Sequence, residues 1–373
     1  MVYRLFLNRV AVILGLLLAY VGVRLLEPFA PAAQVAGAAV LAACFWLLPK
    51  GFRVGRAPGP RAVLLRWLTM GFFSWLLVLT ALRELTLLVA ALTLAPALDA
   101  AYVRESALAV MLATPAITAI GYFMARRVAP VVEVEVRLAD LPAGLEGFTI
   151  AQISDIHVGP TIKRPYVERI VERVNRLEAD MVAITGDLVD GPVEELAHHT
   201  EPLSRLASRH GTYVVTGNHE YYSGVHGWVR ELVRLGARVL LNEHVVLEHE
   251  GASLAVAGVT DWSAHYFDPA HASDPRRAFA GAPAHAIKVL LAHQPRSARA
   301  AAAAGFDLQL SGHTHGGQFW PWNLLVRLQQ PFTAGLNRLG RMWIYINRGT
   351  GYWGPPMRFG IPSEITRIRL VGE

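Results

Sequence analysis

Long apolar runs fill the first 128 residues and set them apart from the rest of the chain. A helix needs about 20 apolar residues to cross the hydrocarbon layer of a membrane. The runs predict spans at residues 5–25, 35–48, from 63 onward and at 107–124, about four in all. The second run approaches the required length only when residues 29–33 are included. We therefore predict an α-helical transmembrane region over residues 1–128.

The third run leaves the number of spans open. It extends from residue 64 to 94, which is too long for one simple span, and the charged pair Arg83-Glu84 interrupts it. One interpretation is an ion pair near the membrane interface within a single helix. The other is a break that separates a span from a re-entrant or fifth segment. The choice matters because an odd number of spans would invert the topology.

After residue 128 the pattern changes to short apolar strands that alternate with amphipathic helices. Valines alternate with charged residues over 131–138, as expected of a half-exposed strand. Strands at 147–153 and 181–185 flank a helical repeat at 164–178, which is a βαβ unit. Further strands are predicted at 212–216, 254–259, 287–292, 307–310 and 342–346, and further helices at 227–235 and 297–304. This alternation predicts an α/β domain over residues 129–373.

Five polar blocks interrupt this domain, and each one follows the carboxyl end of a predicted strand. The blocks are Asp155-Ile156-His157, Gly186-Asp187, Gly217-Asn218-His219-Glu220, His293 and Gly312-His313-Thr314-His315. The carboxyl edge of the strands is where open α/β sheets form their sites. Each block alone is commonly a turn or a helix cap. Five such blocks in order after five strands predict one shared site.

The residue types in these blocks are those that bind divalent metal ions. Asp187 lies in a tight turn after Gly186, and its two oxygens suit it to bridge a pair of ions. Asp155 and His157 are two residues apart on an extended segment, so both side chains face the same way. His313 and His315 repeat that spacing. Asn218 and His293 add an amide oxygen and a further imidazole.

Nitrogen and oxygen ligands without thiolate favour Mn, Fe, Co or Zn over copper or cluster sites. The chain has a single cysteine, Cys44, which excludes intramolecular disulfides, zinc–thiolate clusters and iron–sulfur ligation. The sequence therefore predicts a cofactor of two divalent metal ions bound by imidazole, carboxylate and amide groups.

The two regions differ in net charge, which bears on the orientation of the chain in the membrane and on its binding partners. Residues 1–128 contain 12 Lys or Arg and 4 Asp or Glu, whereas the remainder contains 23 basic and 25 acidic residues. The net charge of −2 on the predicted domain argues against a nucleic-acid partner. With four spans, three basic clusters fall on one side of the membrane: Arg4 and Arg9; Lys50, Arg53, Arg56, Arg61 and Arg66; Arg126 and Arg127. The positive-inside rule then places the N-terminus and the catalytic region in the cytoplasm.

The order D-x-H, G-D, G-N-H-E, H and G-H-x-H resembles the calcineurin-like metallophosphoesterase superfamily. Gly316-Gly317-Gln318, Asn347-Arg348-Gly349-Thr350-Gly351, Arg358-Phe359 and Pro362-Ser363-Glu364-Ile365 resemble the bacterial YkuE/YaeI-type branch. The apolar N-terminal region resembles that of transmembrane proteins with a metallophosphoesterase domain. The resemblance covers residues 131–373 and implies a two-sheet α/β sandwich with outer helices.

The resemblance also implies a role for each residue of the site. The first metal would be bound by Asp155, His157, Asp187 and His315, and the second by Asp187, Asn218, His293 and His313. His219 would bind no metal and would donate a proton to, or hydrogen-bond, the leaving oxygen. The nucleophile would be a metal-bound hydroxide.

Two features bear on the substrate. Arg348 and Arg358 would either contact a substrate phosphate or form structural ion pairs. The aromatic residues near the polar blocks would either form a rim that admits an amphiphile or cover the sandwich core. Those residues are Phe319, Trp320, Trp322, Tyr221, Tyr222, Tyr352 and Trp353.

These observations predict a metallophosphoesterase of the bacterial inner membrane that hydrolyses a phosphomonoester, phosphodiester or pyrophosphate. A lipid-linked substrate is attractive because the chain is tethered to a membrane, and some relatives of the branch hydrolyse a UDP-diacylglucosamine. The alternatives are a protein phosphatase or nuclease on the same metal core, and a non-enzymatic membrane sensor or scaffold. The sequence gives no oligomeric state.

Overall fold

The computed structural model describes residues 2–51, 59–93 and 99–373, and it divides the chain into two compact units. The first unit contains residues 1–126 together with 354–359, and the second contains residues 127–353 and 360–373. The predicted boundary at 128/129 lies in the short connection between the last long helix and the first strand. Arg53 and Arg56, two residues of the predicted basic clusters, lie outside the described residues.

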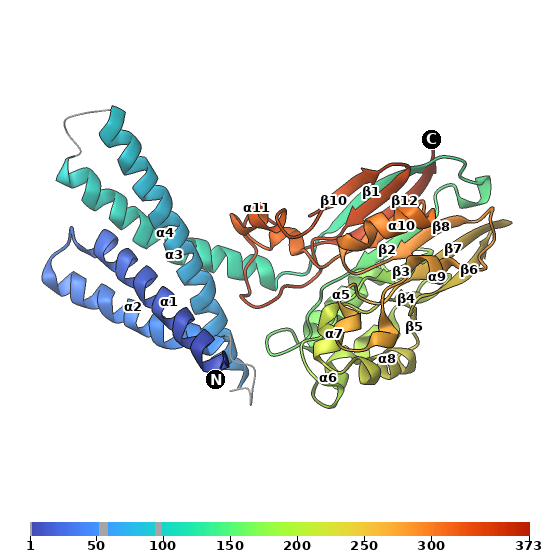
Figure 1. The fold of residues 1–373 in the computed structure, drawn as a ribbon, viewed down its shortest axis with the longest axis horizontal. Coiled ribbons are helices and arrows are strands. Elements are labelled where there is room, and N and C mark those ends of the chain that lie inside the picture. Colours follow the sequence, from blue (N-terminus) through green and yellow to red (C-terminus); the bar gives the residue numbers. More distant parts are fainter. Residues whose placement is uncertain (1, 52–58, 94–98) are drawn as a thin grey trace. The chain divides into compact units, whose positions relative to one another are not determined.

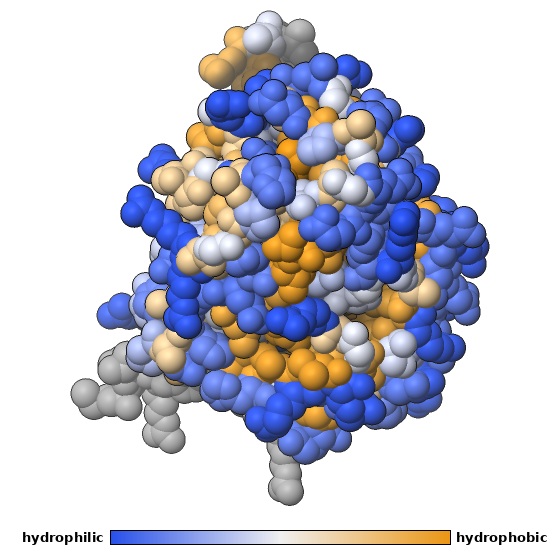
Figure 2. Space-filling view, turned by 90° about the vertical axis from the view of Figure 1, so that its right-hand side faces the viewer, coloured by the Kyte–Doolittle hydropathy of each residue, from blue (hydrophilic) through white to orange (hydrophobic). Residues whose placement is uncertain are grey.

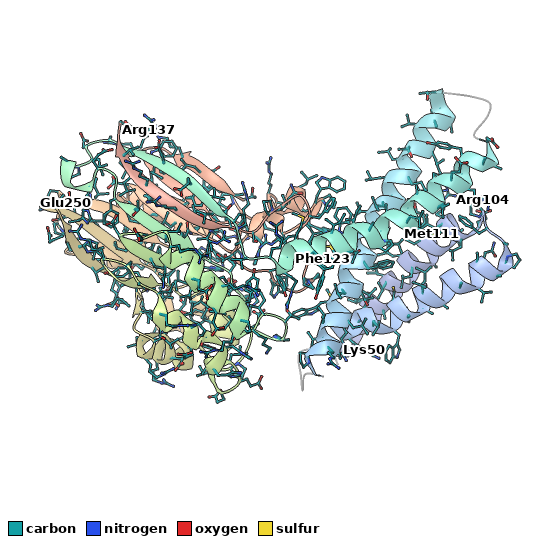
Figure 3. All side chains as sticks on the ribbon, turned by 180° about the vertical axis from the view of Figure 1, so that it is seen from behind. Lys50, Arg104, Met111, Phe123, Arg137 and Glu250 are labelled. Carbon is teal, nitrogen blue, oxygen red and sulfur yellow. The ribbon has the colours of Figure 1, made fainter. Side chains whose placement is uncertain are left out.

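Four long helices form most of the first unit (Figure 1). All four are long and apolar enough to cross a membrane. They are α1 (Val2–Leu26), α2 (Pro31–Gly51), α3 (Pro60–Thr93) and α4 (Ala100–Arg126). Their outward-facing side chains include many large apolar residues that are more than half exposed, as expected of a lipid-facing surface. Lys50 and Arg104 lie toward opposite ends of the helices (Figure 3).

The charged pair in the third run lies within one continuous helix and forms an ion pair, whereas a break in the run is not found there. The side chain of Arg83 is 3% exposed and forms an ion pair with Glu84, which in turn pairs with Arg24 of α1. The Arg83 guanidinium also donates to the carbonyl oxygens of Arg24 (3.1 Å) and Val103 (2.8 Å), the latter in α4. Because these donors are satisfied by α1 and α4, the arginine joins three helices.

The segment 354–359 belongs to the helical unit although it comes late in the sequence. Met357 Sδ accepts a hydrogen bond from Trp75 Nε1 at 2.9 Å, and the ring of Phe359 lies edge-on to Trp75 with centroids 5.2 Å apart. A Cβ atom on Gly71 of α3 would collide with the Met357 side chain, and one on Gly121 of α4 would lie 2.7 Å from its Cγ. The two glycines therefore make room for Met357.

The second unit is a sandwich of two six-stranded sheets, as predicted. The order of the first sheet is β1-β12-β2-β3-β4-β5, and that of the second is β10-β11-β9-β8-β7-β6. The strands are β1 (Val131–Leu138), β2 (Thr149–Ile153), β3 (Met181–Ile184), β4 (Thr212–Val214), β5 (Arg238–Val239), β6 (Glu243–His249), β7 (Ala252–Gly258), β8 (Ile287–Leu291), β9 (Leu308–Ser311), β10 (Gly335–Leu339), β11 (Met342–Ile346) and β12 (Ile365–Gly372). Strands β2 to β5 are parallel, and so are β7, β8, β9 and β11.

Apolar side chains from both sheets form the central core, so the sheets pack face to face. Ile150 and Met181 of the first sheet share this cluster with Leu254 and Val289 of the second. Helices lie outside the sandwich (Figure 1). They are α5 (Arg164–Asn175), α6 (Val193–Thr200), α7 (Asn218–Tyr222), α8 (Val225–Arg234), α9 (Pro275–Phe279), α10 (Ala298–Ala304) and α11 (Trp322–Val326). The face of the molecule in Figure 2 is mostly hydrophilic, as expected of a water-exposed surface.

Candidate metal centre

The five polar blocks meet at one edge of the sandwich, because each follows the carboxyl end of a parallel strand. Three blocks follow β2, β3 and β4 of the first sheet, and two follow β8 and β9 of the second. Both sheets therefore contribute to the site, as the positions of the blocks predict. Backbone hydrogen bonds tie neighbouring blocks together: Asp155 N donates to Gly186 O at 2.9 Å, and Gly312 N donates to His293 O at 3.0 Å.

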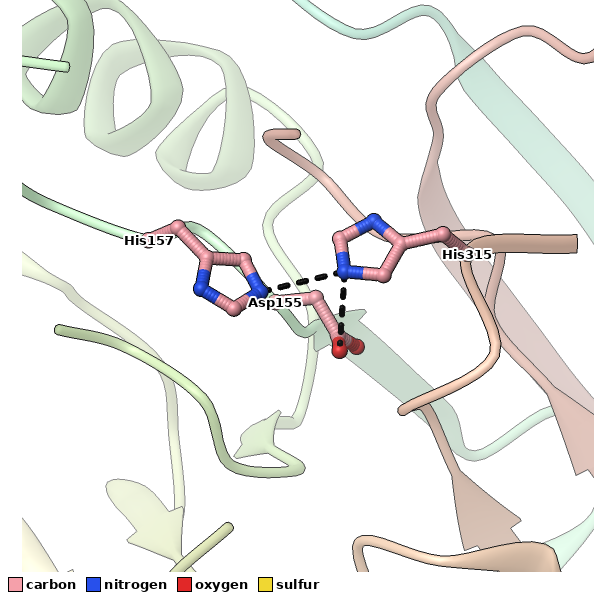
Figure 4. A group of neighbouring side chains, drawn as sticks. All are labelled: Asp155, His157 and His315. Carbon is pink, nitrogen blue, oxygen red and sulfur yellow. Dashed lines mark hydrogen bonds and ion pairs between the residues drawn. The ribbon is translucent and has the colours of Figure 1, made fainter. Parts of the chain in front are cut away.

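Asp155, His157 and His315 form the first group of potential ligands (Figure 4). His157 Nε2 lies 3.0 Å from His315 Nε2, which is 3.5 Å from Asp155 Oδ1. All three residues are buried. The three ligand atoms lie within 4.8 Å of one another, so a single ion can contact all of them.

Asp187, His293 and His313 form the second group. His293 Nε2 lies 3.1 Å from Asp187 Oδ2 and 3.1 Å from His313 Nδ1. The same Asp187 oxygen lies 4.0 Å from His157 Nε2 of the first group. Asp187 therefore stands between the two groups.

The residues of the site fit divalent ions in two further respects. Asn218 Oδ1 is buried and accepts no hydrogen bond from the described residues, which leaves it available as a ligand. His157 Nδ1 faces Asp190 Oδ1 at 2.9 Å, and this contact assigns the proton to Nδ1 and the lone pair to Nε2. The lone pair then points toward the other ligands of the first group. Imidazole, carboxylate and amide ligands of this kind suit Mn, Fe, Co or Zn.

The backbone at the site is strained in a way that the sequence does not show. Five of the seven predicted ligands have a positive φ between 50° and 70°, the left-handed region that disfavours side chains. They are Asp155, His157, Asp187, His313 and His315. Each such residue costs about 1–2 kcal/mol. Strain of this kind clusters at functional sites, where the surrounding structure imposes it.

Electrostatic interactions within the site fix the charge of several groups in the ion-free protein. Burial would raise the pKa of Asp187, but positive charge on His293 and His219 holds it well below its usual value. Burial would lower the pKa of His293, but the Asp187 carboxylate raises it well above its usual value. Burial and the charge of His293 lower the pKa of His313 to about 3. A cation bound here would compete with a proton on His293.

Asp190 belongs to the site although the sequence analysis did not single it out. Its Oδ1 accepts from His157 Nδ1 at 2.9 Å and from His219 Nδ1 at 2.6 Å. Burial would raise the pKa of Asp190, but these two histidines lower it to about 2. One carboxylate thus orients both a predicted ligand and the predicted proton donor. Its position three residues after Asp187, in the loop that follows β3, was the available signal.

Glu220 was part of a predicted block but had no assigned role. Its buried carboxylate accepts from the backbone N–H groups of Gly217 (2.6 Å), Asp187 (3.0 Å) and Leu188 (2.7 Å). Burial and the nearby Asp187 charge raise its pKa to about 7. Glu220 therefore fixes the loops after β3 and β4 relative to each other.

His219 lies beside the two groups at the surface of the site. Its side chain is 15% exposed and is flanked by the rings of Tyr222 and Trp353, with centroids 5.1 Å and 5.8 Å away. Burial would lower the pKa of His219, but Asp187 and Asp190 raise it to about 9. The imidazole is therefore protonated at neutral pH, with Nδ1 engaged by Asp190 and Nε2–H available as a donor.

The sequence of the chain matches known proteins. Residues 148–317 match the model of the calcineurin-like phosphoesterase family. A metallophosphoesterase of Aquifex aeolicus is 33% identical over 235 residues, which cover 62% of this chain and 88% of that protein. The chain belongs to the metallophosphoesterase family.

Other metallophosphoesterases are similar over longer stretches. A transmembrane protein with metallophosphoesterase domain from Danio rerio is 39% identical over 275 residues, 72% of this chain and 63% of that protein. The metallophosphoesterase YkuE of Bacillus subtilis is 29% identical over 263 residues, 67% of this chain and 90% of that protein. The chain spans about three fifths of the length of the transmembrane relatives it matches.

The two arginines predicted to contact substrate lie in different places in this metallophosphoesterase. Arg348 pairs with Glu364 at 3.3 Å, and its side chain is 34% exposed beside Gly316, which follows the last ligand. Arg358 is completely buried and belongs to the helical unit. The structure therefore brings Arg348 to the neighbourhood of the last predicted ligand, whereas Arg358 is a buried residue of the other unit.

Proposed function

We propose that this chain is a membrane-anchored, dinuclear metal-dependent phosphoesterase. The observation that carries the proposal is the convergence of the predicted ligands from both sheets around Asp187, with a protonated His219 beside them. The proposed ligands are Asp155, His157, Asp187 and His315 for one ion, and Asp187, Asn218, His293 and His313 for the other. Bound divalent ions supply Lewis-acid chemistry and neutralise charge on phosphoryl oxygens.

The chain itself supplies proton donation and positioning. His219 Nε2–H donates to the leaving oxygen of the phosphoester, because its Nδ1 is already held by Asp190. Asp187 and Asp190 favour the protonated form of this imidazole, and Asp190 orients it. We propose that Arg348, whose side chain is 34% exposed beside Gly316, contacts a substrate phosphate.

We further infer that the substrate is a phosphoester or pyrophosphate linked to a lipid, of the UDP-diacylglucosamine kind. Tyr222 and Trp353 flank His219 and are 60% and 54% exposed, so they are available to an amphiphile. Leu324 and Leu325 of α11 are also half exposed. By contrast Phe319, Tyr221 and Tyr352 are buried in the domain, so only part of the predicted rim reaches solvent.

The proposal places the protein in the bacterial inner membrane with its catalytic unit in the cytoplasm. Arg66 Nη1 donates to Lys50 O, which brings these two basic residues to one end of the helices. At the other end, Arg24 and Arg83 are balanced by Glu84. The positive-inside rule assigns the basic end to the cytoplasm. A reporter enzyme that functions only in the cytoplasm should be active when it is fused to either terminus. Activity of a reporter that functions only in the periplasm would overturn this orientation.

Hydrolysis of a chromogenic phosphodiester by the full chain in detergent tests the activity. We expect Mn²⁺ to stimulate hydrolysis and His219→Ala to lower kcat by about 10²–10⁴-fold while bound metal is retained. His285→Ala is the matched control, because this exposed histidine precedes β8, at the strand edge opposite the site. Unchanged kcat in His219→Ala would refute the proton-donor role. No hydrolysis with Mn, Fe, Co or Zn would refute the phosphoesterase.

A panel of esters with short and long acyl chains tests the substrate class. We expect kcat/KM to rise with chain length, and Trp353→Ala to remove that preference without changing hydrolysis of the short ester. Phosphopeptides and oligonucleotides belong in the same panel. Faster hydrolysis of either would favour a protein phosphatase or a nuclease instead.

A further inference from the structure

A second cluster of metal-binding side chains lies on the sandwich unit and shares no residue with the candidate metal centre. His226 is on α8, and Asp268 and His271 are on the segment 264–272 between β7 and α9. His226 Nε2 lies 3.4 Å from Asp268 Oδ2, and His271 Nε2 lies 3.8 Å from the same oxygen. Ligand atoms of a tetrahedral Zn²⁺ site with bonds of about 2.1 Å are roughly 3.4 Å apart. The cluster therefore needs little rearrangement to bind this ion.

The remaining polar atoms of Asp268 and His271 are already engaged, which leaves the proposed ligand atoms free to face one another. Asp268 Oδ1 accepts from Ala270 N at 2.9 Å, so the capping of this turn uses only one of the two carboxylate oxygens. His271 Nδ1 is hydrogen-bonded to the hydroxyl of Tyr221 at 2.8 Å, and Tyr221 is buried. Such a partner on the second ring nitrogen is what fixes the orientation of a metal-binding histidine.

We propose that His226, Asp268 and His271 form a mononuclear Zn²⁺ site whose fourth position is open to water. Two imidazoles and one carboxylate are a ligand set that Zn²⁺ accepts. The ring of His226 is 64% exposed, so the ion enters from solvent and this side chain completes the site.

The ion would join α8 to a segment that borders the candidate metal centre. Phe267 precedes Asp268 and lies against Tyr222, with ring centroids 5.4 Å apart, and Tyr222 lies against His219. Binding of Zn²⁺ therefore restricts the segment that supports the exposed Tyr222 beside His219. This inference concerns metal binding and does not require that the protein hydrolyse a phosphoester.

Metal analysis of the full chain in detergent tests the site. The protein is stripped with a chelator, equilibrated with ZnCl₂ and freed of unbound ion before zinc is counted. We expect Asp268→Asn and His226→Ala each to bind one zinc ion fewer than the unaltered protein. Asp268→Asn keeps the Oδ1 cap of Ala270 and so removes the ligand charge with the least disturbance of the turn.

His265→Ala is the matched control, since His265 is an exposed histidine on the same segment whose Nδ1 faces Trp262 O. It should bind as much zinc as the unaltered protein. Equal zinc content in all four proteins would overturn the proposal, and so would an equal loss in His265→Ala. Amide exchange gives a second readout: Zn²⁺ should slow exchange over 264–272 at least tenfold in the unaltered protein but not in His226→Ala.

Discussion

Replacement of Asp190 by Asn separates the two functions that this carboxylate serves. Both His157 Nδ1 and His219 Nδ1 face the same oxygen, Oδ1, at 2.9 Å and 2.6 Å. Asn retains an oxygen there but removes the charge. A hydrogen bond to a charged group contributes about 1.5–3 kcal/mol, roughly twice a neutral one. We therefore expect His219 to lose about 1–2 kcal/mol of stabilisation of its protonated form, which lowers its pKa in the variant.

The consequence for catalysis depends on pH. At mildly acidic pH His219 is protonated in both proteins, so Asp190→Asn should retain most of the activity. As pH rises, His219 loses its proton at a lower pH in the variant than in the unaltered protein. At alkaline pH the kcat of the variant should therefore fall about 10-fold below that of the unaltered protein. The assay is the pH profile of kcat for a chromogenic phosphodiester at saturating Mn²⁺. Saturation is needed because loss of an orienting partner of His157 weakens metal affinity about 10–100-fold.

Asp274→Asn is the matched control, because Asp274 only caps the short helix α9. Its pH profile should coincide with that of the unaltered protein. An equal proportional loss at every pH in Asp190→Asn, with full metal content, would refute the reasoning. It would show that Asp190 does not act through the protonation of His219.

Three further outcomes follow from the geometry. Gly312→Ala should abolish metal retention, because its Cβ would collide with the Asp155 carboxylate; metal analysis of the folded variant checks this. Arg83→Met should destabilise the helical unit by about 3 kcal/mol, whereas the exposed Arg104→Met should not, as thermal unfolding in detergent can show. In the metal-free protein the pKa of His219 is raised to about 9, so its contribution to stability is complete below about 6.5 and is lost as pH rises through 9. The melting temperature should fall across that window, and should fall less in His219→Ala.

Much of the fold follows from local pattern. The strands that precede the polar blocks are short runs of buried apolar residues, and the blocks end them, so both were visible in the sequence. Strand β12 was not predicted. It lies between β1 and β2, parallel to one and antiparallel to the other, and this placement depends on partners more than 200 residues away. No local pattern encodes such a pairing.

The site also combines features that the sequence shows with features that depend on tertiary structure. The predicted ligand types are read directly from the sequence, whereas the role of Asp190 depends on which two imidazoles face it. The left-handed backbone at the ligands is likewise imposed by tertiary structure, because Asp and His do not adopt it by preference. The sequence also could not decide whether Arg358 contacts a substrate phosphate or has a structural role. Its burial follows from the packing of residues 354–359 on α3 and α4.

That packing affects any attempt to produce the sandwich unit alone. A fragment that begins after α4 would still contain Met357 and Phe359, whose contacts with Trp75 would be missing. Water would reach the apolar side chains of Met357 and Phe359 in this segment, so such a fragment should self-associate unless detergent covers them. For the same reason, a protease that cuts only between α4 and β1 should leave both pieces co-purifying, with Met357 as the remaining attachment.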